Sequence, residues 1–182
     1  MDPRDKKWSR LSSETLQTCP YYDFRHDRYR LPNGGEGDYY YIHIAGSTMV
    51  VPVRSDGQLV LVRQHRYLHG RPSLELPAGG IKRGRSPLET AEDELREEAG
   101  LRARSWQKLG EFAPCDGLSD EICHVFLAAE LEEVPSAPEP TEELEMVTLG
   151  LAELRRQIAT GELWDGMTIA ALTLYSVRTS SP

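Results

Sequence analysis

The 182-residue sequence contains few cysteines and no long apolar run. Cys19, Cys115 and Cys123 are odd in number and lack CxxC spacing, which excludes a disulfide framework and a zinc site of the CxxC type and indicates reduced thiols. A membrane span needs about 18 consecutive apolar residues. The basic start MDPRDKKWSR is not followed by the apolar segment of a secretory signal. We therefore expect a soluble, cytoplasmic protein without a membrane partner.

An excess of positive charge is also missing. The formal net charge is −8 at pH 7, whereas nucleic-acid binders need a basic surface that releases counterions from phosphates. The sequence therefore predicts no nucleic-acid partner. Much of the acidic charge lies in two stretches, residues 89–98 and residues 130–145. The second stretch contains three prolines and no apolar periodicity, which predicts an exposed loop.

Short apolar segments separated by turn residues predict a mixed α/β (α+β) domain in which strands outnumber helices. Asn33-Gly34-Gly35 lies between two aromatic strands in residues 1–45, and Asp56-Gly57 lies between STMVVPV and QLVLVRQHRY. Both positions predict hairpins. LELPAGG, residues 74–80, is a short predicted strand that enters a glycine turn. Two more strands are expected on either side of the loop CDGLSDE, residues 115–121.

Three helices are predicted, and the first begins at a capping box. Ser86-Pro87-Leu88-Glu89 combines a serine cap, a proline at the first helical position and a glutamate three residues after the cap. Gly100 is expected to end this helix in the left-handed conformation. The other two helices are expected over LAELRRQIAT, ending before Gly161, and over MTIAALTLYSV, with Asp165 as its cap.

The first helix concentrates negative charge. Six carboxylates lie in residues 89–98, against a single Arg96 in the helix itself. Like charges three or four residues apart repel each other, so a cation is expected to offset them. Mg²⁺ takes oxygen ligands, commonly one or two carboxylates together with waters and substrate phosphates. The cluster beside a strand and a glycine loop therefore predicts a Mg²⁺ or Mn²⁺ site, with a merely solvated acidic face as the alternative.

Helical geometry assigns the faces of this helix. At about 100° per residue one side of the helix is the predicted buried face, which comprises Leu88, Ala91, Leu95 and Ala99. Glu94 and Glu98 lie along one edge of that face and Glu97 lies beside them, further out. The three carboxylates are therefore expected to converge on one side of the helix.

The stretch from Gly79 to Leu101 resembles the box of the Nudix hydrolases. That box runs Gly, five residues, Glu, seven residues, Arg-Glu, apolar, any, Glu-Glu, any, Gly, apolar. The matching positions in this sequence are Gly79, Glu94, Leu95, Glu97, Glu98, Gly100 and Leu101. Outside the box, RLPNGGEGDYYY, LVRQHRY, LELPAGG, GLSDE and GELWDGMTIAALTLY are similar to the ADP-ribose pyrophosphatase-like branch. The likeness thus covers nearly the whole chain.

The resemblance implies a Nudix fold, a mixed β-sheet sandwiched between helices, for residues 46–182. It implies that residues 1–45 form an N-terminal β-hairpin segment, through which this branch typically forms homodimers. The implied activity is hydrolysis of the diphosphate of a nucleoside diphosphate sugar such as ADP-ribose, giving a nucleoside monophosphate and a sugar phosphate. A catalytically silent Nudix-fold module that binds a nucleotide sugar or a protein is the alternative.

The resemblance also implies roles for individual residues. The implied metal ligands are Glu94, Glu97, Glu98 and the carbonyl of Ala78. The implied catalytic residues are Glu97 and the loop acid Glu121, with Asp120 as the alternative to Glu121. The implied substrate-binding residues are Arg66, Arg63, Glu75 and Tyr40.

The sequence departs from the family pattern at three positions. Arg85 stands where the box has Glu, and Asp93 stands where it has Arg. An ion pair of reversed polarity between Arg85 and Asp93 is the simplest interpretation, and a box that is eroded and no longer catalytic is the alternative. Downstream, Asp116 stands where the branch usually carries a proline, so the identity of the sugar diphosphate stays open.

Overall fold

The computed structural model describes residues 7–136 and 143–179. The chain forms two compact units, the first made of residues 1–45 and 113–121 and the second of residues 46–112 and 122–182. In the described residues, no helix combines the length and the apolar character needed to cross a membrane. None of the three cysteines forms a disulfide, as predicted.

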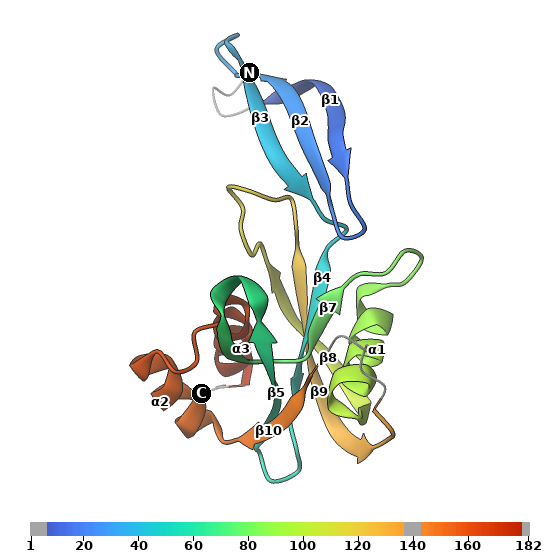
Figure 1. The fold of residues 1–182 in the computed structure, drawn as a ribbon, viewed down its shortest axis with the longest axis vertical. Helices are drawn as coiled ribbons and strands as arrows, with labels where there is room; N and C mark the ends of the chain where they lie inside the picture. Colours follow the sequence, from blue (N-terminus) through green and yellow to red (C-terminus); the bar gives the residue numbers. More distant parts are fainter. Residues whose placement is uncertain (1–6, 137–142, 180–182) are drawn as a thin grey trace. The chain divides into compact units, whose positions relative to one another are not determined.

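The first unit contains an antiparallel three-stranded sheet (Figure 1). Its order is β1 (Ser9–Thr18), β2 (Asp23–Arg30) and β3 (Glu36–His43). The predicted hairpin joins β2 and β3, with Arg30 opposite Glu36. Strand β1 was not predicted. Its sequence SRLSSETLQT is largely polar and exposed throughout, so it lacks the apolar alternation that marks a half-buried strand.

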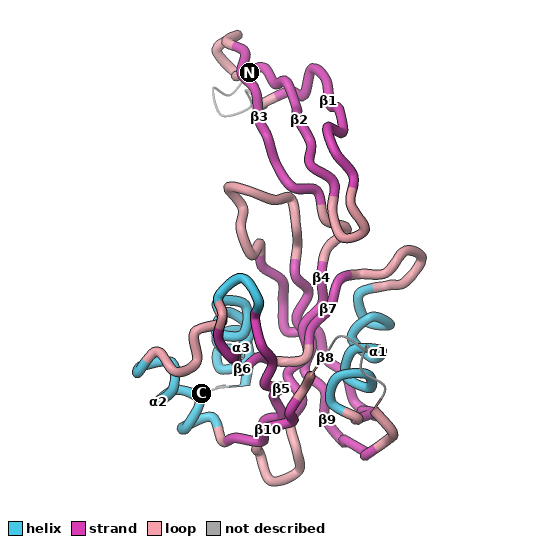
Figure 2. The backbone as a smooth tube through the Cα atoms, in the orientation of Figure 1, coloured by secondary structure: helices cyan, strands magenta, loops and turns pink. Residues whose placement is uncertain are grey.

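The second unit contains two sheets (Figure 2). The four-stranded sheet has the order β7 (Ala78–Gly80), β4 (Ser47–Pro52), β9 (Cys123–Glu133) and β8 (Leu101–Phe112). Strands β4 and β9 are parallel, and the other neighbours are antiparallel. The three-stranded sheet has the order β10 (Glu145–Leu149), β5 (Leu59–Arg66) and β6 (Arg71–Glu75).

Helices cover both sides of these sheets (Figure 1). They are α1 (Pro87–Ala99), α2 (Leu151–Thr160) and α3 (Gly166–Thr179), with a short 3-10 helix η2 (Tyr67–His69). Alternate residues of a strand point to opposite faces, so Val60 packs with Leu95 of α1, whereas Leu61 packs with Leu154 of α2 and Leu172 of α3. The predicted mixed α+β architecture with a sheet between helices is confirmed.

The helix ends follow the local sequence signals. Ser86 Oγ accepts from the Glu89 N–H at 3.2 Å, while the Glu89 carboxylate accepts from the Ser86 N–H at 2.7 Å. Gly100 and Gly161 are left-handed, with φ of 60° and 76°. Asp165 accepts from the Thr168 N–H at 2.7 Å. The predicted capping box, C-caps and N-cap are therefore confirmed.

Other local predictions need correction. The turn at Asp56-Gly57 does not create a regular hairpin, because Val53, just after β4, makes an isolated bridge to Leu59 and the strands β4 and β5 belong to different sheets. LELPAGG is divided between β6 and β7. The loop predicted over residues 130–145 is shorter, because residues 130–133 belong to β9 and residue 145 is the first residue of β10. Residues 137–142 of this loop lie outside the described part of the chain. Leu88 is 36% exposed rather than on the buried face.

Candidate active site

Helix α1 approaches strand β7 at a glycine. A β-carbon at Gly79 would lie 2.3 Å from Cδ and Oε1 of Glu94, so a side chain at this position would occupy the space of the carboxylate. Ala91, Leu95 and Ala99 are buried and hold the helix against the sheet. Glu94 is consequently only 8% exposed, at the junction of α1 and β7.

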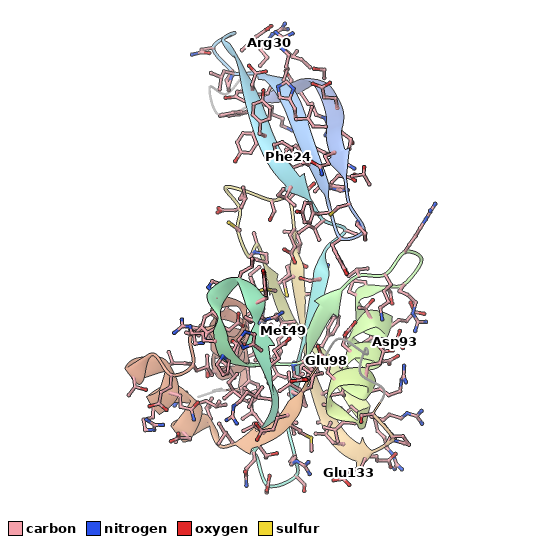
Figure 3. The ribbon with its side chains drawn as sticks, viewed as in Figure 1. Phe24, Arg30, Met49, Asp93, Glu98 and Glu133 are labelled. Carbon is pink, nitrogen blue, oxygen red and sulfur yellow. The ribbon has the colours of Figure 1, made fainter. Side chains whose placement is uncertain are left out.

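Glu98 lies one turn further along the same side of α1. Its Oε2 accepts a hydrogen bond from the backbone N–H of Ala78 in β7 at 3.0 Å. Figure 3 shows this side chain directed from the helix toward the strands. The structure thus brings Glu94, Glu98 and the β7 backbone together, as the sequence predicted.

Glu97 makes different contacts. Its Oε1 accepts from an Nη of Arg96 at 2.7 Å, and its Oε2 accepts from Nζ of Lys82 at 3.2 Å. In the described part of the chain, no three Asp, Glu, His or Cys side chains converge closely enough to hold a metal ion. The predicted convergence of three carboxylates is therefore reduced to two, Glu94 and Glu98. Two carboxylates still suit Mg²⁺, which completes its octahedron with waters and phosphate oxygens.

Cations from the turn before α1 offset much of the acidic charge of the helix. Nζ of Lys82 lies 3.7 Å from Oε1 of Glu94 as well as near Glu97. Burial lowers the pKa of the Lys82 ammonium, but the hydrogen bond to Glu97 and the attraction of Glu94 outweigh burial, so the pKa is raised overall. Arg96 is the basic residue within α1, whereas Lys82 and Arg85 precede the helix in the chain and reach its acids from the turn.

Arg85 and Asp93 form the expected ion pair. Nε of Arg85 donates to Oδ2 of Asp93 at 3.1 Å, and Nη2 donates to the same oxygen. The hydrogen bond to Asp93 raises the pKa of the Arg85 guanidinium. Glu89 adds a weaker contact to Arg85 at 3.8 Å. The two charge reversals in the box thus compensate each other in space.

Arg66 lies at the end of β5 and is held by a buried carboxylate. Its Nε donates to Glu75 at 2.7 Å, and its Nη2 donates to the other oxygen of Glu75. Glu75 is 3% exposed, whereas the Arg66 side chain is 48% exposed. The hydrogen bonds to Glu75, with attraction from Asp165 and Glu98, raise the pKa of Arg66 against the opposing effect of burial. Glu75 therefore contacts Arg66, and Arg66 lies within electrostatic reach of Glu98.

Arg63 does not join this cluster. It is separated from Arg66 by three positions on the strand, so its side chain points to the opposite face. There it donates to Oε2 of Glu145, its cross-strand neighbour in β10, at 2.7 Å. The two predicted substrate-binding arginines therefore lie on opposite faces of β5, and a substrate-binding role for Arg63 stays a prediction.

Three predicted residues belong to the first unit. Tyr40 is exposed and stacks on His26, with ring centroids 4.4 Å apart. The carboxylate of Asp120 accepts from the Ile44 N–H at 3.1 Å and is 2.7 Å from Nδ1 of His43. This gives Asp120 a structural role at the end of β3. The catalytic role of Glu121, the next residue in the chain, stays a prediction.

The same sequence elements occur in a known domain family. The sequence profile of the NUDIX domain matches residues 43–171, which include β7, α1 and both candidate ligands. The chain belongs to the Nudix family. It is 37% identical over 174 residues to an ADP-ribose pyrophosphatase of Mycobacterium tuberculosis (strain ATCC 25618 / H37Rv), covering 93% of this chain and 84% of that protein. It is 30% identical over 170 residues to an ADP-ribose pyrophosphatase of Bacillus subtilis (strain 168), covering 92% of each.

The fold agrees with this assignment. A crystal structure of an ADP compounds hydrolase superposes with a TM-score of 0.82 at 22% sequence identity, covering 94% of this chain and 93% of that one. The predicted Nudix fold is confirmed, and the chain is a Nudix pyrophosphohydrolase. Nudix hydrolases generally use divalent metal ions, and the carboxylates of Glu94 and Glu98 are candidate oxygen ligands for such an ion.

The reversed pair in the Nudix box makes a testable prediction. Arg85→Glu places a second acid beside Asp93, and Asp93→Arg places a second cation beside Arg85, so each single variant should melt at a lower temperature than the wild type. The double variant restores opposite charges and should recover most of the lost stability, because the effects of substitutions at contacting residues are not additive. Thermal melts at low salt measure this, and high salt should shrink the differences. Losses that simply add in the double variant would show that the pair contributes nothing.

Proposed function

We propose that this Nudix protein hydrolyses the diphosphate of a nucleoside diphosphate sugar such as ADP-ribose, with Mg²⁺ or Mn²⁺. The products are a nucleoside monophosphate and a sugar phosphate. One observation carries the proposal: the carboxylates of Glu94 and Glu98 lie against β7 in a chain that is 37% identical to an ADP-ribose pyrophosphatase. The cytoplasm is the proposed location.

Glu94 and Glu98 are the proposed ligands of the ion, with the Ala78 carbonyl as a further candidate. A divalent ion held there would neutralise phosphate charge and lower the pKa of a bound water. Glu97 lies outside this pair in the structure and contacts Lys82 and Arg96. The family resemblance implied that Glu97 is both a metal ligand and a catalytic residue. We retain the catalytic role and assign the metal to Glu94 and Glu98.

Arg66 is the proposed phosphate contact. Glu75 engages its Nε and Nη2, so Nη1 is available to a phosphate oxygen on the exposed side. Arginine suits this role because its planar guanidinium presents several donors in a fixed arrangement. Glu75 is too deeply buried to be a direct ligand of the substrate. We therefore assign Glu75 the role of positioning Arg66.

The metal assignment predicts which glutamate of α1 is essential. Glu98→Gln keeps the shape of the side chain but removes a ligand charge, so turnover should fall by orders of magnitude. Glu92→Gln is the matched control, because it makes the same charge change at an exposed position of the same helix. Both are assayed on ADP-ribose and a panel of other nucleoside diphosphate sugars with Mg²⁺, Mn²⁺ or chelator. Full activity of Glu98→Gln or in chelator would contradict the proposal, and no turnover of any diphosphate by the wild type would favour the silent module.

Glu121 is the proposed loop acid that acts after substrate binding, either as the general base or as a late metal ligand. Glu121→Gln should then lower kcat much more than it raises KM, because the residue acts after binding. Steady-state kinetics on the best substrate of the panel separate the two parameters. A loss confined to KM would instead mark Glu121 as a binding residue.

We also propose a homodimer formed through the first unit, including residues 1–45. A three-stranded sheet with little buried surface is marginal by itself, and an exposed edge strand is a template for pairing with another chain. Strand β1 is exposed along its whole length, and Leu11 and Leu16 are exposed on it. Tyr40 is exposed on β3 and is retained as a candidate base contact.

The dimer proposal predicts the mass of the protein in solution. Sedimentation equilibrium should give about twice the mass of one chain, and the double change Leu11→Lys and Leu16→Lys should shift the protein toward monomer. Lys7→Gln, an exposed change just before β1, is the control. A wild-type protein that is monomeric at micromolar concentration would contradict the proposal.

A further inference from the structure

Lys82 lies in the turn between β7 and α1, and it reaches one of the proposed metal ligands. Its Nζ is 3.7 Å from Oε1 of Glu94 and 3.2 Å from Oε2 of Glu97. The lysine side chain is 50% exposed, whereas the two carboxylates are largely shielded from solvent. A flexible, half-exposed cation therefore sits over the acidic cluster on which the proposed function depends.

Two other cations of the box contact acids on the outer part of α1. Arg85 pairs with Asp93 and Glu89, and Arg96 pairs with Glu97. These contacts offset charge along the outer part of α1. Lys82 differs because its contacts extend to Glu94, the carboxylate that packs against Gly79.

An ammonium and a divalent ion compete for such a carboxylate. An ion bound to Glu94 would lie within a few ångströms of the present position of Nζ, where two positive charges repel strongly in a partly desolvated site. Lysine carries its point charge on a flexible four-carbon stem, so it is able to move aside. The turn that carries it also contains Gly84 at a φ of 81°.

We propose that Lys82 is an internal counter-cation that competes with the divalent ion for Glu94 and so sets the metal affinity of the enzyme. The inference rests on the proposed function, since it assumes that Glu94 is a metal ligand. In the absence of metal, Lys82 stabilises the crowded carboxylates. When metal binds, the ammonium gives up Glu94, and the displaced contact weakens the net affinity.

Direct measurement of Mn²⁺ binding tests this without substrate or turnover. Free Mn²⁺ is followed by electron paramagnetic resonance during titration of the wild type, Lys82→Gln, Lys82→Arg and Arg83→Gln. Lys82→Gln should bind Mn²⁺ on the order of 10-fold more tightly, because the ion no longer has to displace a competing positive charge. Lys82→Arg keeps the charge and should remain near the wild type. Arg83→Gln removes an adjacent exposed cation and should have a much smaller effect.

Thermal melts of the same variants provide a second readout. In chelator, Lys82→Gln should melt below both the wild type and Arg83→Gln, and saturating Mn²⁺ should close most of that gap. Equal Mn²⁺ affinities for Lys82→Gln and Arg83→Gln, or weaker binding by Lys82→Gln, would overturn the inference while leaving a metal-dependent wild type intact. If neither the wild type nor Lys82→Gln binds Mn²⁺, the proposed metal function fails and the competition fails with it.

Discussion

The contact between Glu94 and Gly79 is the constraint on which the candidate site depends. The carboxylate occupies the space that a β-carbon at residue 79 would take, so α1 approaches β7 closely only because that strand carries a glycine there. Burial of Ala91, Leu95 and Ala99 holds the helix in this place. Glu98 then follows one turn later, within reach of the Ala78 N–H. A buried carboxylate needs a compensating partner, and Lys82 provides one, with its Nζ 3.7 Å from Oε1 of Glu94.

The charge of α1 is balanced mainly by the chain itself. Lys82, Arg85 and Arg96 contact the acids of the helix, so crowding alone does not require a metal ion. Glu94 and Glu98 lie beside the β7 backbone in a chain of the Nudix family, and this position supports a metal site more strongly than the crowding of charge does. The pair of Arg85 and Asp93 adjusts the local charge, whereas the buried Glu75 fixes the orientation of the half-exposed Arg66, the proposed phosphate contact.

The sequence correctly predicted the helix ends, because these depend on interactions between adjacent residues. The capping box at Ser86, the left-handed glycines and the Asp165 cap each depend on a few adjacent residues, and all are present. Strand β1 was missed because its polar sequence has no buried face to create a pattern. Lys82 was missed because its contacts depend on how the turn folds back over α1. The family resemblance implied substrate-binding roles for both Arg63 and Arg66, but strand alternation sends the two side chains to opposite faces.

We propose that a divalent ion binds at the junction of α1 and β7, between Glu94 and Glu98. Crystals of the protein soaked in Mn²⁺ and measured for anomalous scattering test this most directly. The account predicts an anomalous peak within coordination distance, about 2.0–2.3 Å, of oxygens from both carboxylates beside Gly79. A peak elsewhere, or no peak at this junction under conditions that support hydrolysis, would contradict it.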